Sequence, residues 1–181
     1  MSSTTTIDWN KYNFSNTKPF SLKGIEGFAR VVHIHDGDTF TAIIPLLDDF
    51  YKFSIRLAWI DTCEIKSSNK ENQKLATKAR DRLINLVKTK KEDDKKQHEE
   101  EEDIKPYLLR NIELVYLSCQ EFDKYGRVLA NVKKTDTDTE TFSEILVKEK
   151  LAYRYDGKKK LTDEEQLKIL LMITDFSTTS S

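Results

Sequence analysis

Hydrophobic and polar residues alternate along three stretches near the start of the chain, at residues 28–34, 39–44 and 52–59. A period of two residues is typical of a β-strand that buries one face. The alternation is clearest in the third stretch, where it predicts a core-facing row made of Phe53, Ile55, Leu57 and Trp59. The sequence Asp-Gly-Asp at 36–38 separates the first two stretches and indicates a tight turn.

The pattern changes to a helical period after residue 70. Apolar residues at spacings of one, three and four predict one amphipathic helix, with a stripe of Leu75, Ala76, Ala79, Leu83 and Val87. Two more strands are predicted at 111–117 and 127–133, and two helices begin at capping-box patterns at 141–144 and 162–165. The order β-β-β-α-β-β-α-α predicts an α+β fold, an OB-type five-stranded barrel with about three α-helices.

Three parts of the chain lack this patterning. Residues 88–105 contain one apolar residue in eighteen, which is too few to offset the entropy lost on ordering, so we expect a flexible charged insertion. An acidic metal-binding cluster is the alternative for this segment. We also expect a flexible arm at 1–22, a flexible tail at 174–181, and one domain at 23–173 that contains the insertion. Four aromatic residues of the arm are candidates to anchor it on the surface: Trp9, Tyr12, Phe14 and Phe20.

Composition limits the class of protein. A length of 181 residues suits one domain. The longest apolar run, at 42–47, is far shorter than the roughly 20 residues of a membrane-spanning helix, so we expect no membrane partner. The amino terminus lacks the segments of a secretory signal, and we expect an intracellular protein whose compartment the sequence does not identify. Cys63 and Cys119 are the only cysteines, and we expect them to be reduced.

The net charge of −1 argues against a protein that binds nucleic acid, because such proteins usually carry an excess of Lys and Arg. However, the insertion at 88–105 holds six Lys and eight acidic residues, so the rest of the chain carries a net +1. The total charge therefore does not exclude a polyanionic substrate. It predicts that phosphate contacts concentrate in a single cleft.

Polar residues gather where the predicted strands end, in the segments 36–39, 56–64 and 123–127. Their carboxylates suit Ca²⁺ or Mg²⁺, and their guanidinium groups suit phosphate oxygens. Hydrolysis of a phosphodiester needs a metal, cationic clamps and an oriented water. Each segment also has a simpler interpretation: a hairpin turn, a surface ion pair between Arg56 and Asp61, and a charged turn. The combination of all three segments favours a phosphodiesterase.

The motifs VVHIHDGDTF, IRLAWIDTCE and DKYGRVLA, in this order, resemble those of the staphylococcal nuclease (thermonuclease) family. The resemblance covers about residues 28–155. It implies an OB-type barrel with three helices and a Ca²⁺-dependent endonuclease that hydrolyses DNA and RNA to 3′-phosphate and 5′-hydroxyl products. It also implies single-stranded or unpaired DNA and RNA as partners, and we expect a monomer. The alternative is a catalytically silent module that binds nucleic acid or protein, although such modules typically lose the charged residues that this chain retains.

The resemblance further implies how the site would hold its metal. Asp38 and Asp61 would be the carboxylate ligands of Ca²⁺, and the backbone carbonyl of Thr62 would be a third ligand. Asp36 would support these ligands from behind. Glu64 would orient or deprotonate the attacking water, because Ca²⁺ alone acidifies water poorly.

The same resemblance implies contacts to the substrate. Arg56 and Arg127 would hold the scissile phosphate and stabilise its transition state. Four residues would contact the surrounding nucleotides, the first two at a phosphate and one of the last two by stacking on a base: Lys124, Tyr125, Tyr153 and Tyr155.

The chain departs from the family pattern at three points. Cys63 stands where the family usually has proline, so the backbone that carries Glu64 is less restrained. A cysteine at this point also brings a thiol near the metal ligands, although burial in the core is the default for that side chain. The charged insertion and a short carboxy-terminal helix are the other departures.

Overall fold

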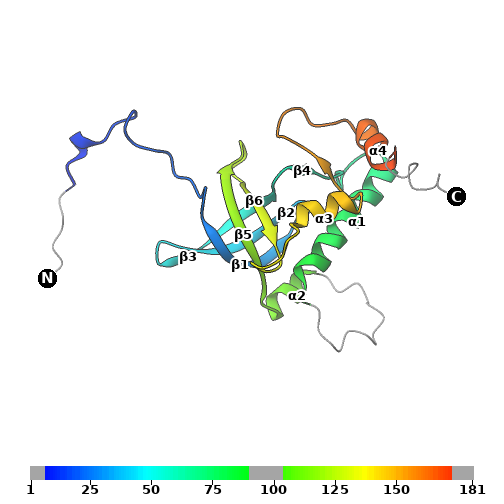
Figure 1. The fold of residues 1–181 in the computed structure, drawn as a ribbon, viewed down its shortest axis with the longest axis horizontal. Coiled ribbons are helices and arrows are strands. Elements are labelled where there is room, and N and C mark those ends of the chain that lie inside the picture. Colours follow the sequence, from blue (N-terminus) through cyan, green and yellow to red (C-terminus); the bar gives the residue numbers. More distant parts are fainter. Residues whose placement is uncertain (1–6, 90–103, 173–181) are drawn as a thin grey trace.

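The computed structural model describes residues 7–89 and 104–172, so the predicted tail and most of the predicted insertion lie outside the described residues. Five strands form the central sheet: Glu26–Ile34 (β1), Thr39–Leu46 (β2), Asp49–Leu57 (β3), Glu113–Phe122 (β5) and Val128–Lys133 (β6). They close into a barrel in the order β1-β2-β3-β6-β5, in which only the β3–β6 pair is parallel (Figure 1). The predicted α+β fold with a five-stranded OB-type barrel is confirmed.

In the described part of the chain, four α-helices accompany the barrel: Lys70–Val87 (α1), Ile104–Arg110 (α2), Phe142–Lys148 (α3) and Asp163–Met172 (α4). A small antiparallel sheet pairs Ile60–Asp61 (β4) with Tyr153–Arg154 (β7), and a single 3₁₀ turn lies at Trp9–Lys11. Figure 1 shows α1, α3 and α4 on one side of the barrel, while the amino-terminal segment extends from the other side. No helix among residues 7–89 and 104–172 is long and apolar enough to cross a membrane.

Apolar side chains fill the barrel, because alternate residues of each strand point inward. The fully buried ones include Phe40, Ala42, Ile55, Leu57, Val128, Ala130 and Val132. Burying a large aliphatic or aromatic side chain stabilises a fold by about 1.5–3 kcal/mol, so these inward-pointing side chains contribute much of the stability of the barrel. Since the interior is packed, polar functional groups must lie on the rim of the barrel.

The predicted core-facing row of the third strand is wrong at Trp59. Strand β3 ends at Leu57, the amide of Ala58 donates to the carbonyl of Ala130, and the chain then turns. Trp59 itself has φ of 69°, and its side chain is 55% exposed. A period of two residues continues through this turn in the sequence, and therefore it conceals the point where the strand ends.

The predicted insertion is wrong at its end, where the structure has the unpredicted helix α2. Ile104 is the apolar residue of that segment, and it is buried together with Leu108. Both side chains join the main core. One apolar residue in a charged run was too weak a signal to predict a helix, because the rest of the apolar face follows after residue 105.

Three of the four aromatic residues of the amino-terminal arm do not anchor it on the surface. Trp9, Tyr12 and Phe14 are largely exposed, and Phe14 is completely so. Phe20 lies with its ring centroid 6.1 Å from that of Phe122, but it remains mostly exposed. The chain joins the core at Leu22, which is fully buried. Of the four candidate anchors, Phe20 thus lies against an aromatic residue of the barrel, and the other three are largely exposed.

The helices follow their predicted signals closely. The stripe of α1 is buried at Ala76, Ala79, Leu83 and Val87, whereas Leu75 is only partly buried. Thr141 and Glu144 form the predicted capping box at the start of α3. At the start of α4, Thr162 and Glu165 exchange the equivalent pair of hydrogen bonds. Local polar pairing thus determines where both helices begin.

One buried carboxylate ties the helices to the barrel. Glu113 accepts hydrogen bonds from the amide and hydroxyl of Thr89 at 2.9 and 2.7 Å, from the Tyr107 hydroxyl at 2.6 Å and from Lys134 Nζ at 3.1 Å. Burial raises the pKa of Glu113, but these hydrogen bonds outweigh it and lower the pKa below its ordinary value. The carboxylate therefore stays charged and holds the ends of α1 and β6 next to α2.

The Asp-Gly-Asp turn packs directly on α1 through its glycine. A Cβ atom on Gly37 would lie 2.6 Å from Ala79 Cβ and 3.1 Å from Thr62 Cγ2. We predict that Gly37→Ala lowers the free energy of unfolding by about 1–3 kcal/mol, the usual cost of overpacking. Urea denaturation measures this loss. In an Ala79→Gly background the loss should shrink, because the clashing methyl is gone; an equal loss in both backgrounds would contradict this contact.

Candidate active site

A cleft of about 1080 Å³ opens on the rim of the barrel. Four separate segments line it: the turn between β1 and β2, the end of β3 with β4, the hairpin between β5 and β6, and the segment that follows β7. All of the site residues predicted from the sequence line this cleft except Tyr153. The three polar segments of the sequence therefore lie together in one cleft. A hairpin turn, a surface ion pair and a charged turn would not need to meet in this way.

Arg56 lies at the centre of the cleft between two buried carboxylates. Its Nη1 donates to Asp38 Oδ1 at 2.7 Å, and its Nη2 donates to Asp61 Oδ1 at 2.5 Å. Asp38 and Asp61 are each 2% exposed. Strand β3 supplies the arginine, the start of β2 lies next to Asp38, and β4 supplies Asp61. The guanidinium group thus joins three parts of the chain by charge-assisted hydrogen bonds.

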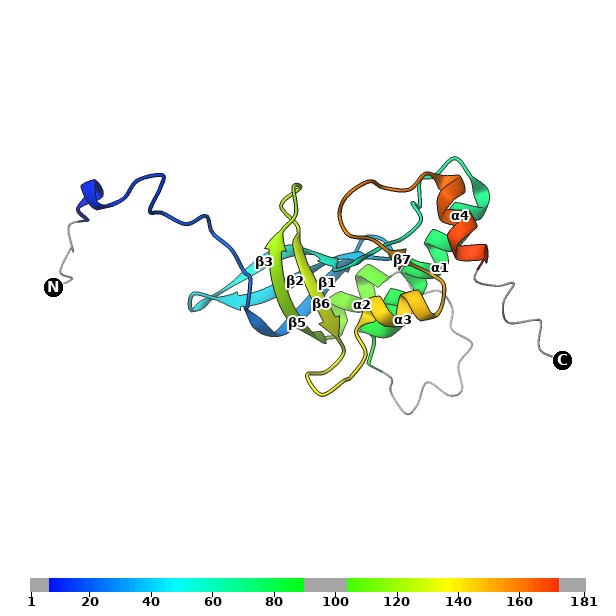
Figure 2. The same cartoon turned by 45° about the horizontal axis from the view of Figure 1, so that its top comes forward.

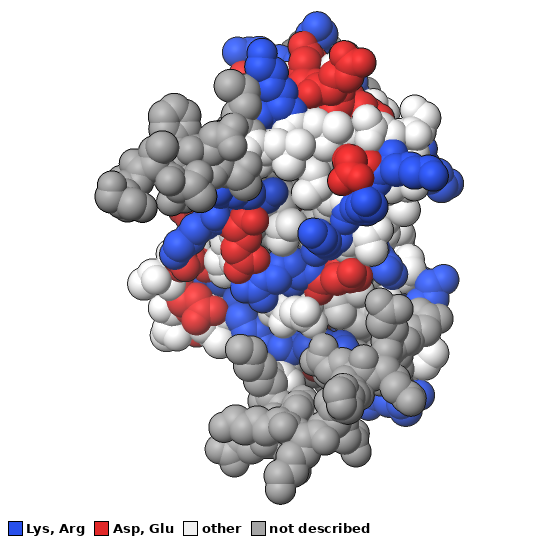
Figure 3. All heavy atoms as spheres, turned by 90° about the vertical axis from the view of Figure 1, so that its right-hand side faces the viewer, with Lys and Arg blue, Asp and Glu red and all other residues white. Residues whose placement is uncertain are grey.

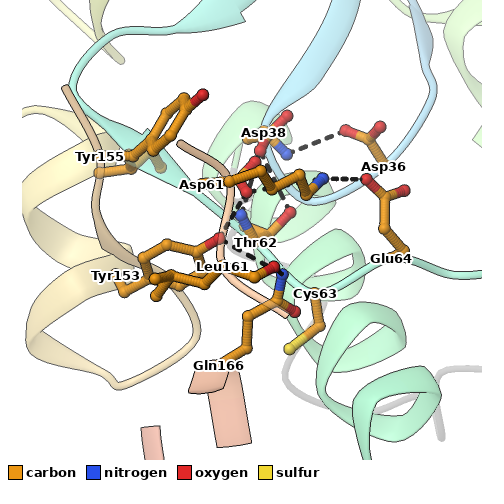
Figure 4. Close-up of polar contacts among 12 residues, drawn as sticks. Asp36, Asp38, Asp61, Thr62, Cys63, Glu64, Tyr153, Tyr155, Leu161 and Gln166 are labelled. Carbon is orange, nitrogen blue, oxygen red and sulfur yellow. Dashed lines mark hydrogen bonds and ion pairs between the residues drawn. The ribbon is translucent and has the colours of Figure 1, made fainter. Parts of the chain in front are cut away.

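Further donors hold Asp38 in this position. Its Oδ1 accepts from the Thr39 hydroxyl at 2.8 Å, and its Oδ2 accepts from the amide and hydroxyl of Thr62 at 3.2 Å each. Asp36 accepts the amide of Asp38 at 3.1 Å through its Oδ1 (Figure 4). The structure therefore gives Asp36 a supporting position behind Asp38, and it brings Thr62 directly against the same carboxylate.

Tyr153 contacts the carboxylate of Asp61 and does not face the cleft. Its hydroxyl donates to Asp61 Oδ2 at 2.5 Å, and its side chain is only 4% exposed. Gln166 Nε2 donates to the Tyr153 oxygen at 3.3 Å (Figure 4). Asn72 Nδ2 in turn donates to Gln166 Oε1 at 3.2 Å. The prediction that Tyr153 stacks on a base does not fit this burial, whereas Tyr155 does line the cleft.

Gln166 and Asn72 were missed by the sequence reasoning. Both are fully buried polar residues, one on α4 and the other on α1. Their spacing in the sequence carries no motif, so only their burial reveals that they extend the contacts of Asp61. Through them, the packing of two helices determines the position of one carboxylate.

Cys63 is a neutral core residue. It is 2% exposed and belongs to a small apolar cluster with Ala76, Tyr153 and Leu170. Burial raises the pKa of its thiol to about 11, so the thiolate that a metal would need does not form near neutral pH. Cys63 and Cys119 are both buried and are not joined to each other by a disulfide.

Glu64 and Lys160 form an ion pair at the mouth of the cleft. Lys160 Nζ donates to Glu64 Oε1 and also lies 3.5 Å from Asp61 Oδ2. Burial lowers the pKa of Lys160, but the hydrogen bond to Glu64 and the charge of Asp61 raise it further, so the ammonium stays charged. The sequence reasoning missed Lys160, because nothing distinguishes it from its neighbours in a run of three lysines.

The hairpin between β5 and β6 presents a second arginine to the cleft. Arg127 Nε donates to Asp123 Oδ2 at 2.7 Å, and Asp123 Oδ1 accepts the amides of Tyr125 and Arg127. The Tyr125 ring lies 5.3 Å from the Arg127 guanidinium and 5.0 Å from Lys124 Nζ. Asp123 thereby orients the arginine, while the exposed ring and both cations line the same wall of the cleft.

Two aromatic residues flank the opposite part of the cleft. Trp59 and Tyr155 both line it, and the amide of Tyr155 donates to the carbonyl of Trp59 at 2.9 Å. The sequence reasoning assigned Trp59 to the core. The positive φ of this residue instead turns its ring outward, where it can meet a ligand.

The site buries two carboxylates close together, and burial disfavours their negative charge. Burial, together with the charges of Asp36 and Asp61, raises the pKa of Asp38 to about 7 against the opposing effect of Arg56. Burial lowers the pKa of Arg56, but Asp38 and Asp61 raise it further, so the guanidinium stays charged. A cluster of this kind is stabilised by added positive charge.

The donor set fits a hard divalent cation. Asp38 and Asp61 reach one guanidinium group, so one cation can meet both carboxylates. Within residues 7–89 and 104–172, no three side chains of His, Cys, Asp or Glu are grouped as a ready-made metal cage. Ca²⁺ takes six to eight oxygen ligands, and carbonyls, water and substrate phosphate can complete a set that begins with two carboxylates.

The raised pKa of Asp38 makes the stability of the metal-free protein depend on pH. A carboxyl group with a higher pKa in the folded state takes up a proton on folding, so its contribution to stability is lost as the pH rises from about 4 to about 7. We predict that the wild type loses about 2–4 kcal/mol relative to Asp38→Asn over this range. Urea unfolding in chelator at several pH values measures it, and a constant difference between the two proteins would be the contrary result.

The family model described as staphylococcal nuclease homologue matches residues 54–172, which is well over half of the chain. The match includes Arg56, the segment from Asp61 to Glu64 and the hairpin that carries Arg127. The turn at 36–38 precedes the matched residues, and the fold brings it into the same cleft. No curated protein matches the chain. With its closed five-stranded barrel and its matched residues, the chain belongs to the family of staphylococcal nuclease homologues.

Proposed function

We propose that this protein is a Ca²⁺-dependent nuclease that hydrolyses DNA and RNA to 3′-phosphate and 5′-hydroxyl products. The observation that carries the proposal is the convergence of acids and arginines on one open cleft of a nuclease-family barrel. Phosphoryl chemistry requires little more than positioning and charge stabilisation, and these residues can supply both.

Asp38 and Asp61 would hold the metal, and the backbone carbonyl of Thr62 would add a third protein ligand. When bound, Ca²⁺ would supply positive charge that polarises the phosphodiester. Arg56 now neutralises both carboxylates, so it would exchange these partners for the phosphate oxygens. Because Arg56 already lines the cleft, it would stay within reach of the reacting phosphate.

Arg127 would hold the phosphate from the opposite wall. Asp123 holds its Nε, and Arg127 lines the cleft. The planar guanidinium group has two further nitrogens that can bind two phosphate oxygens. Glu64 would orient the attacking water and accept its proton. Its carboxylate is about half exposed at the mouth of the cleft, where water has access.

The wall of the cleft suits an unpaired strand better than a duplex. Trp59, Tyr125 and Tyr155 present aromatic rings in it, and stacking on such a ring is worth about 1–3 kcal/mol per base. Lys124 would contact a neighbouring phosphate. We therefore propose single-stranded or unpaired DNA and RNA as substrates, bound by a monomer.

Surface charge outside the cleft adds a weak general attraction for polyanions. Figure 3 shows Lys and Arg side chains in a band across the face on the right of Figure 1, with acidic side chains interspersed. Helix α1 contributes the exposed residues Lys70, Lys74 and Lys78, which are four residues apart and so share one side of the helix. This arrangement agrees with a modest affinity for nucleic acid that depends on salt.

A catalytically silent binding module is the second candidate. The observation that favours it is that the proposed metal ligands and the proposed base are already paired with cations of the protein. Arg56 neutralises Asp38 and Asp61, and Lys160 neutralises Glu64. Digestion of single-stranded DNA in Ca²⁺ and in chelator separates the two candidates. We expect cleavage only with Ca²⁺; binding without cleavage in both conditions would establish the silent module.

We predict that Arg127→Ala lowers the cleavage rate about a thousandfold, because it removes positive charge from the transition state. Its thermal unfolding should change little, since the side chain lies on the rim and contacts mainly Asp123. The matched control is Arg154→Ala, an exposed arginine outside the residues that line the cleft. Equal losses of rate in both variants would contradict a specific role for Arg127.

We predict that Glu64→Gln lowers kcat about a hundredfold or more while KM stays similar, because a general base acts in turnover rather than in binding. Single-turnover cleavage and Ca²⁺ titration together measure the effect. If the variant instead loses Ca²⁺ affinity and regains its normal rate in excess metal, Glu64 is a metal ligand.

A further inference from the structure

Lys160 lines the cleft, and the proposed chemistry gives it no role. It comes from the segment between β7 and α4, which Figure 2 shows as a long arched loop. Its ammonium group contacts two acids at once, Glu64 by a hydrogen bond and Asp61 at 3.5 Å. These acids are the proposed base and a proposed metal ligand.

The backbone on both sides of Lys160 is held in place. The Tyr155 hydroxyl donates to the carbonyl of Lys158 at 3.2 Å, and Gln166 Nε2 donates to the carbonyl of Leu161 at 3.1 Å. The Lys160 side chain is 44% exposed, against 84% for Lys158. Lys160 is therefore directed into the cleft by its surroundings, unlike a surface lysine that samples many positions.

A lysine and a divalent cation cannot share this position. Asp61 Oδ2 already accepts from Tyr153, and its Oδ1 accepts from Arg56, so the approach of the ammonium adds a third positive or donor group to one carboxylate. A metal ion bound to Asp61 would lie close to the Lys160 ammonium, and the two positive charges would repel each other. The ammonium group must withdraw for the metal to reach full coordination.

We propose that Lys160 is a built-in competitor of the divalent cation: it neutralises Asp61 and Glu64 in the metal-free protein and is released into the cleft when metal binds. The inference rests on the proposed function, because it assumes the same metal ligands. It assigns Lys160 the role of setting the metal affinity of the site. Release of the ammonium also frees Glu64 to meet water, so metal binding and readiness of the base are coupled.

Calorimetric titration of the full chain with CaCl₂ alone, at fixed ionic strength, tests the proposal. We expect Lys160→Gln to bind Ca²⁺ about five- to tenfold more tightly than the wild type, since one competing charge interaction is lost. Lys160→Arg keeps the charge and should bind no more tightly than the wild type. The matched control is Lys159→Gln, which makes the same charge change on the neighbouring exposed residue.

A second measurement uses the wild type and so does not depend on whether a variant folds. Acetylation of lysines, followed by mass spectrometry, reports how accessible each amine is. In chelator, Lys160 should be acetylated more slowly than Lys159. Addition of Ca²⁺ should raise the acetylation rate of Lys160 and leave the rate of Lys159 unchanged.

The outcomes separate this inference from the proposed function. If Ca²⁺ binds the wild type but Lys160→Gln is no tighter than Lys159→Gln, the competitor role is overturned and the nuclease proposal stands. An acetylation rate of Lys160 that ignores Ca²⁺ overturns it equally. If Ca²⁺ binds neither the wild type nor any variant, the metal site itself is overturned.

Discussion

The site of this protein depends on one constraint: two carboxylates are buried beside each other and need positive charge between them. Arg56 meets that need with hydrogen bonds of 2.7 and 2.5 Å to Asp38 and Asp61. Removing a single member of such a buried arrangement leaves an uncompensated charge, which is far more costly than losing a surface ion pair. The same excess of negative charge makes the site receptive to a cation and directs the arginine to the place where a phosphate would arrive.

The barrel and the helices divide the work of holding this arrangement. Strands β2 and β3 lie side by side and bring Asp38 next to Arg56, while β4 carries Asp61 beyond the turn at Trp59. The other side of Asp61 is held by Tyr153, which in turn contacts Gln166 on α4. Distortions in the packing of the helices therefore reach the acids of the cleft through a short series of hydrogen bonds. This connection gives the short helix α4 a role beyond stability.

Local sequence patterns predicted most helices and strands, but they did not predict features that depend on contacts between residues far apart in the sequence. The capping pairs that start α3 and α4 were recognised because both partners lie within four residues. Helix α2 was missed because Ile104 gains its partners only from the assembled core. Tyr153 was expected in the cleft and is buried, because it belongs to the small β4–β7 sheet. Trp59 was expected in the core and is exposed, because its positive φ turns the ring outward.

The sequence by itself determined that the fold is a barrel, the order of its strands along the chain, the family and the residue types that line the cleft, because these depend on local periodicity and on motifs carried within short segments. Tertiary structure alone decided that Tyr153 contacts Asp61 and that Lys160, one of three consecutive lysines, meets the acids of the cleft. The physical reason is that pairing of charges depends on distance in space. Lys160 lies 96 residues from Glu64 along the chain, and no local pattern records which of many lysines will fold back to meet that acid.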